Sequence, residues 1–130
     1  MNKTVLLLLP TVVLTGCASL AGTDPADAHR IAIDKVDSSL ATIRMVTVTP
    51  SEAGIRVRGD LTRKPASRGP VYGHVHIEVL GADDQTLLAR DTRQRRRNAK
   101  SRSVQFSEYL AVDPATVTFV RITHHSPWQP

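Results

Sequence analysis

Cysteine is nearly missing from this chain of 130 residues, which contains only Cys17. A single cysteine excludes an internal disulfide, so a small domain made from this sequence depends on packing for its stability. It also leaves the chain after residue 17 without a cysteine nucleophile. The lone thiol therefore needs a role other than a structural crosslink.

Aromatic residues are also scarce, at 4% of the chain, whereas hydrophobic residues make up 41%. Valine, isoleucine, leucine and alanine therefore have to fill the core of one small domain. The few aromatic residues do not alternate with the arginines, as stacking platforms for nucleic-acid bases would require. We therefore expect no nucleic-acid partner, although the chain has a net charge of +5.

The usual motifs of catalysis are missing as well. The sequence has no GxSxG nucleophile elbow and no glycine-rich phosphate loop. Its one adjacent pair of carboxylates, Asp83 and Asp84, lies in a turn by composition. A domain of about 100 residues also offers little room for a concave active site. The sequence therefore predicts a protein that is not an enzyme.

The most distinctive pattern that is present lies at the N-terminus. Lys3 supplies a positive charge, an apolar run covers residues 5–13, and the pattern closes on Leu14-Thr15-Gly16-Cys17. The apolar run has about 10 to 12 residues, whereas a membrane-spanning helix needs about 20. A short apolar run that ends in small residues is typical of a cleaved secretory signal.

The segment Leu14-Thr15-Gly16-Cys17 resembles the lipobox of bacterial lipoproteins. The resemblance implies that residues 1–16 are a signal peptide and that Cys17 is the first mature residue, with a diacylglycerol on its thiol. In such proteins an aspartate directly after the cysteine favours retention at the inner membrane, whereas Ala18 and Ser19 follow here. The resemblance therefore implies an anchor in the outer membrane, with the protein facing the periplasm. The alternative is a plain secretory signal.

The rest of the chain divides into a tether, one domain and a tail. Residues 17–28 are small, polar and rich in turn formers, as expected of a lipidated tether. Residues 29–125 are expected to form the domain, and residues 126–130 a C-terminal tail. Residues 29–37 fit either a strand or a helix opened by Asp24-Pro25. We favour the strand, because the sequence that follows is strongly β-like.

Alternation of apolar and polar residues predicts short strands through most of the domain. Residues 55–61 alternate strictly, with Ile55, Val57 and Leu61 on one side. This segment is expected to form a hairpin with residues 40–49 across a turn at 50–54. Further strands are expected at residues 71–80, 85–91, 103–110 and 116–123.

Six or seven strands at about ten-residue spacing, without a long helical pattern, predict an all-β fold. We expect a small antiparallel two-sheet sandwich, which resembles immunoglobulin and fibronectin type III domains in architecture. The paired cysteines of antibody domains are absent and the single tryptophan lies in the tail, so the resemblance carries no functional motif. The register of the final strand stays open, because Val117 and Phe119 alternate out of phase with Val120 and Ile122. Coverage of both faces or a bulge would explain the conflict.

Histidines occur at two places that strand pairing could bring together. His74 and His76 lie on one face of one strand, about 6.6 Å apart at Cα. His124 and His125 end the last strand, which often neighbours the third strand of a sandwich. Imidazoles at this spacing, with Glu78 in the same row, suit zinc or copper. The alternative is a polar, solvent-exposed strand face without a ligand.

Basic residues are concentrated between Asp91 and Glu108, with no acid among them. We expect a loop that attracts an anionic partner, such as phospholipid head groups, acidic glycans or an acidic protein surface. A second basic region surrounds residues 55–61. The alternative is a solvated loop that protects neighbouring strand edges. The residues expected to contact the anionic partner are Arg93, Arg95, Arg96, Arg97, Lys100 and Arg102.

Together these features predict a small, non-catalytic lipoprotein on the periplasmic face of the outer membrane. We expect a binding or structural accessory module of the cell envelope, held by lipid on Cys17 and contacting an envelope protein or an anionic surface. The alternative function is a periplasmic lipoprotein that binds zinc or copper through His74 and His76, with His124 or His125. No other cofactor is expected.

Overall fold

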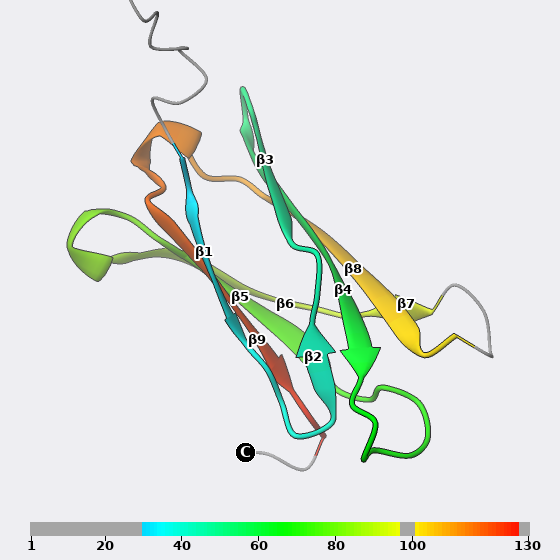
Figure 1. The fold of residues 1–130 in the computed structure, drawn as a ribbon. Coiled ribbons are helices and arrows are strands. Elements are labelled where there is room, and N and C mark those ends of the chain that lie inside the picture. The colour runs from blue at the N-terminus through cyan, green and yellow to red at the C-terminus, as the bar shows by residue number, and fades with distance from the viewer. Residues whose placement is uncertain (1–29, 97–100, 128–130) are drawn as a thin grey trace, which may run out of the picture.

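The computed structural model describes residues 30–96 and 101–127, which form two β-sheets packed face to face (Figure 1). The predictions for the signal peptide, for Cys17 and for the tether lie outside these residues. The elements in chain order are β1 (Ala32–Val36), β2 (Ala41–Ile43), β3 (Thr47–Ser51), β4 (Gly54–Arg63), β5 (His74–Leu80), η2 (Ala82–Asp84), β6 (Thr86–Thr92), β7 (Arg95–Arg96), β8 (Ser103–Leu110), η3 (Pro114–Thr116) and β9 (Phe119–His125).

The first sheet has the strand order β1-β9-β5-β6, and the second has the order β2-β4-β8-β7, with β3 also paired to β4. All of these pairs are antiparallel except the first, since β1 runs parallel to β9. The all-β two-sheet sandwich is confirmed, and residues 29–37 contain a strand, β1, as favoured. In the described part of the chain, no helix has the length and apolar character needed to cross a membrane.

The core lies between the two sheets and follows the alternation of the sequence. Ile55, Val57 and Leu61 of β4 are fully buried, whereas Arg56 and Arg58 between them are exposed. Aliphatic side chains fill most of this space, as the low aromatic content requires. The facing sheet contributes the fully buried side chains Val75, Ile77, Val79, Val120 and Ile122.

The single strand expected at residues 40–49 is wrong, because the structure contains two strands there. Both pair with β4, but Ile43 lies opposite Leu61 whereas Thr47 lies opposite Arg58, so the register shifts by one residue between β2 and β3. Such an extra residue turns the following side chains to the other face. Ile43 and Val48 are five residues apart, which in one regular strand would place them on opposite faces. Because of the extra residue, both point toward the core.

The final strand begins later than expected, and this removes the conflict of phase. Val117 is fully buried but precedes β9, so it is not part of the alternation. Within β9 the buried side chains are Val120, Ile122 and His124. The basic loop expected between β6 and β8 also needs correction, since Arg95 and Arg96 form the short edge strand β7 on β8.

Candidate functional site

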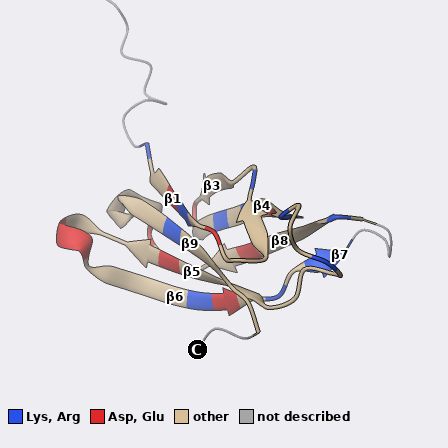
Figure 2. Cartoon of the chain, turned by 60° about the horizontal axis from the view of Figure 1, so that its bottom comes forward, with Lys and Arg blue, Asp and Glu red and all other residues tan. Residues whose placement is uncertain are grey.

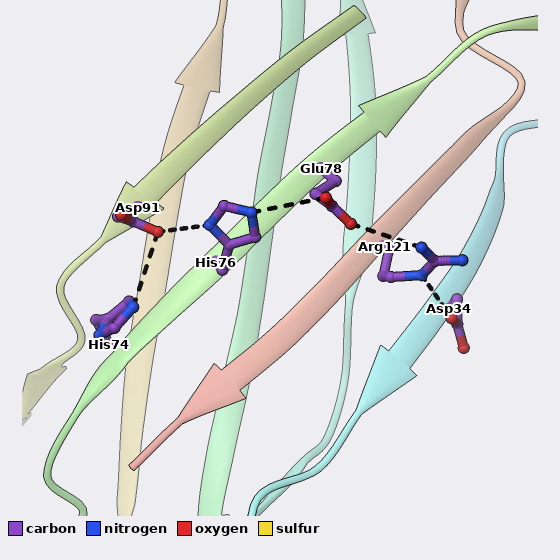
Figure 3. Close-up of polar contacts among 6 residues, drawn as sticks. All are labelled: Asp34, His74, His76, Glu78, Asp91 and Arg121. Carbon is purple, nitrogen blue, oxygen red and sulfur yellow. Dashed lines mark hydrogen bonds and ion pairs between the residues drawn. The ribbon is translucent and has the colours of Figure 1, made fainter. Parts of the chain in front are cut away.

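A row of polar side chains crosses the outer face of the first sheet, from β1 through β9 and β5 to β6 (Figure 3). Acidic residues alternate with basic residues or histidines along it, so neighbouring groups attract one another. We call it the histidine row, and it consists of Asp34, Arg121, Glu78, His76, Asp91 and His74.

Arg121 of β9 lies near one end of the histidine row, between Asp34 and Glu78. Its Nε lies 3.2 Å from Asp34 Oδ2 and its Nη1 lies 3.6 Å from Glu78 Oε2. Glu78 in turn has its Oε1 3.8 Å from His76 Nε2. Arg121 is therefore neutralised by two carboxylates of its own sheet, which leaves it little attraction for an outside anion.

The other end of the histidine row centres on Asp91, which strand register places opposite His76. His76 Nδ1 lies 2.6 Å from Asp91 Oδ1, and because a carboxylate only accepts, Nδ1 is the donor. This hydrogen bond lowers the pKa of the Asp91 carboxyl. His74 Nε2 lies 3.8 Å from the same oxygen. One carboxylate thus links both histidines of β5.

The expected approach of the last strand to His74 and His76 occurs, because β9 pairs with β5. The two C-terminal histidines nevertheless go to opposite faces. The His125 ring stacks on His74 with centroids 5.2 Å apart and lies 6.0 Å from the His76 ring. His124 points into the core and is 1% exposed. Three of the four expected histidines therefore share one surface.

The ring nitrogens of His74 and His76 face neighbouring carboxylates rather than a common centre where a metal ion could bind. His76 uses Nδ1 for Asp91, and its Nε2 faces Glu78. Among residues 30–96 and 101–127, no group of three or more histidines, cysteines or carboxylates is arranged to hold a metal ion. The zinc or copper site stays a prediction.

The buried His124 fixes the turn between the two sheets. Its Nδ1 lies 2.7 Å from Ser38 Oγ, and that oxygen accepts the backbone N–H groups of Leu40 and Ala41, each at 3.1 Å. The Ser38 hydroxyl therefore donates its proton to Nδ1, which leaves the ring proton on Nε2. Nε2 is buried and has no hydrogen-bond partner among the described residues. A second proton on this ring would be costly.

His124 should make the stability of the domain fall in mild acid. Burial lowers its pKa below the usual 6.5, and the backbone of Tyr72 offsets only part of this effect. Below pH 6.5 the unfolded chain binds a proton at this position before the folded chain does. The contribution of His124 to the free energy of unfolding is thus fully present above that pH. It is lost as the pH falls toward the lower pKa of the folded state, by up to about 1.4 kcal/mol per pH unit.

Urea unfolding between pH 8 and pH 5 measures this dependence. We expect a His124→Gln variant to be less stable at pH 8 but to show a flatter curve than the wild type. The other four histidines of the chain remain in both proteins, so they cancel in the comparison. Parallel curves for the two proteins would contradict the assignment to His124.

The second sheet has a different charge pattern, with basic segments on β4 and β7 (Figure 2). Register places Arg56 opposite Tyr109, Arg58 opposite Ser107, and Arg95 opposite Gln105. Within the described residues these three arginines form no ion pair, in contrast to Arg121. Asp60 is the acidic residue in the same rows. We call this surface, with Arg56, Arg58, Arg95, Ser107 and Tyr109, the arginine face.

The arginine face contains two shallow hollows that share Arg58 and Thr47. One has a volume of about 440 Å³ and is also lined by Arg56 and Tyr109. The other, of about 400 Å³, reaches Asp60. Guanidinium groups next to hydroxyls offer several hydrogen-bond donors in a small area, a combination that suits phosphate or carboxylate oxygens.

The arginines selected from the sequence are only partly brought to this face. Arg95 belongs to it, and Arg93 lines an adjoining hollow of about 380 Å³ with Arg95. Arg96 lies on the opposite side of β7, because it pairs with the inward-facing Val104. Arg102 lies just before β8. Arg97 and Lys100 lie outside the described residues.

Sequence reasoning missed the role of Asp91, and it assigned Arg56 and Arg58 only to a second basic region. Asp91 joins the histidines, and its position opposite His76 follows from the short turn at η2. Arg56 and Arg58 were recognisable as exposed residues of an alternating strand, but only the pairing of β4 with β8 shows what lies beside them.

Comparison with known proteins adds no relative from which a role could be transferred. No family model, no curated protein and no solved structure matches the chain.

Proposed function

We propose that this protein is a lipid-anchored binding module of the bacterial envelope, non-catalytic and facing the periplasm from the outer membrane. Its N-terminal Leu-Thr-Gly-Cys17 segment supports the anchor. The domain supplies two stable sheet faces with different charge patterns, and the arginine face is the binding surface. Its partner is anionic.

One observation carries this proposal, namely the contrast between the two outer faces. On the first sheet, Arg121 is engaged by Asp34 and Glu78. On the second sheet, Arg56 and Arg58 have no carboxylate partner in the described part of the chain and line hollows with hydroxyl groups. Unpaired arginines retain their attraction for an external anion, which is strongest at low salt.

Binding to anionic vesicles tests the arginine face. The protein carries Cys17→Ser, so that lipid does not determine the result, and is mixed with vesicles of phosphatidylglycerol in phosphatidylcholine. Each arginine near an anionic membrane surface contributes about 1 kcal/mol. The double variant Arg56→Gln/Arg58→Gln should therefore bind roughly tenfold to thirtyfold more weakly. The salt dependence of binding should also be flatter.

The matched control removes the same charge from the first sheet. Arg90→Gln/Arg121→Gln should retain most of the binding, because Arg121 is already neutralised by two carboxylates and Arg90 lies on β6 of the first sheet, outside the arginine face. An equal loss in both double variants would show that net charge alone is responsible. Unchanged binding in the Arg56/Arg58 variant would contradict the proposal.

Zinc or copper binding is the second candidate. It is favoured by the pairing of β5 with β9, which places His125 against His74 and His76. An ion would have to turn these half-buried rings away from their present partners. Saturable heat in a Zn²⁺ titration, abolished by His74→Ala, would support this function. Absence of heat with Zn²⁺ and Cu²⁺ would exclude it.

A further inference from the structure

An apolar groove opens along one side of the sandwich, where the two sheets separate. Its volume is about 580 Å³, within the range of small-molecule sites. Its described lining is mostly aliphatic and comes from three elements near one end of the domain (Figure 1). These residues are Arg30, Ile31, Ile33, Val48, Pro50, Pro114 and Ala115.

The groove exists because two edge strands face each other without pairing. β1 pairs with β9, and β3 pairs with β4, so each has a free edge within the described structure. Ile33 lies opposite Val120 in the register, on the core side of its sheet, yet it is 38% exposed. Val48 packs against the core from the other sheet and is only partly buried. Core-facing aliphatic residues are thus left in contact with water.

The position of the groove on the chain points to its occupant. Arg30 is both a lining residue and the first described residue of the domain. Cys17 lies thirteen residues before Arg30. Even a fully extended chain of that length reaches at most about 45 Å. A group attached to Cys17 is therefore confined near the groove, at an effective concentration that a free ligand rarely reaches.

We propose that this groove binds one fatty acyl chain of the lipid carried by Cys17 of the same molecule. The inference rests on the proposed lipidation. The aliphatic lining matches an acyl chain, and Arg30 is the single charged side chain among the described lining residues. With one acyl chain in the groove and the others in the bilayer, the domain lies close to the membrane with β1 and β3 toward the lipid.

Photocrosslinking in cells tests this placement on the full chain. Cells are grown with a fatty acid that carries a diazirine at its terminal carbon, irradiated, and the protein is purified and digested. The expected product joins the Cys17 lipopeptide to a peptide containing Ile33 or Val48. Lipoprotein purified from heavy-isotope and from ordinary cells, combined in one vesicle preparation before irradiation, distinguishes links within one chain from links between chains.

Substitutions at two residues of β1 with nearly equal exposure test whether the groove itself is required. Ile33→Glu places a charge in the groove and should reduce the link roughly tenfold, because an acyl chain does not cover a carboxylate. Val36→Glu is the control, since Val36 is 39% exposed and pairs with Thr123 on the opposite face. Ala115→Trp, which fills the groove without a charge, should act like Ile33→Glu.

The other outcomes are distinguishable. Groove peptides linked only to phospholipid would assign the groove to membrane lipid, and links between heavy and ordinary chains would assign it to a second copy; either overturns the inference. A lipidated Cys17 peptide without groove links overturns this inference alone. A Cys17 peptide without lipid overturns the anchor as well.

Discussion

Replacement of Cys17 by serine is expected to remove the protein from the membrane fraction almost completely. Each acyl methylene in a bilayer contributes about 0.8 kcal/mol, so two or three acyl chains make attachment effectively permanent. Serine has no thiol to carry the diacylglycerol. Incorporation of labelled palmitate, together with fractionation of the envelope, measures both consequences in the same cells.

A neighbouring substitution separates loss of the lipid from a general defect in export. Ser19→Ala leaves Leu14-Thr15-Gly16-Cys17 intact, so this variant should incorporate palmitate and fractionate like the wild type. The Cys17→Ser protein should contain no label. If it remained labelled and membrane-bound, the lipoprotein interpretation of the N-terminus would be wrong.

Replacement of Gly73 by alanine is expected to cost about 3–5 kcal/mol of the free energy of unfolding, among the largest effects of a single substitution. Gly73 has a φ of +113°, a region that residues with a side chain rarely adopt. A Cβ at this position would also overlap the carbonyl oxygen of His125. Relief would require moving the backbone where β5 begins beside the end of β9.

Gly69 provides a matched control in the same loop. Its φ is +81°, but a Cβ there would have no atom within 4 Å. Gly69→Ala should therefore cost only the conformational penalty of about 1–2 kcal/mol. Urea unfolding of both variants, followed by circular dichroism, measures the difference. Similar stabilities would show that the close approach of β9 to Gly73 is unimportant.

Strands with a regular alternation were predictable from the sequence. Residues 55–61 lie within β4 with the expected inward and outward faces, and His74, His76 and Glu78 share the outer face of β5. In these segments the burial of aliphatic side chains and the two-residue period of a strand give the same answer. The sequence therefore indicates the fold class and the position of two candidate ligands.

Features that depend on pairing between distant segments were not predictable in this way. The one-residue shift between β2 and β3 becomes clear only from their common partner β4. Which of His124 and His125 faces the core depends on the pairing of β9 with β5, which sets His124 beside the buried Val75. A period of two residues turns an uncertainty of one position into the opposite face.

The parallel pairing of β1 with β9 has a consequence for folding during the export that we propose. Among the described strands, β9 is the only partner of β1, and it is the last strand of the domain. A chain that crosses the inner membrane with its N-terminus first exposes β1 long before residues 119–125 arrive. Because these contacts join the two ends of the domain, the first sheet cannot be completed until translocation is nearly finished. A nascent chain held before that point should remain unfolded at its β1 edge, where helper proteins could still reach it.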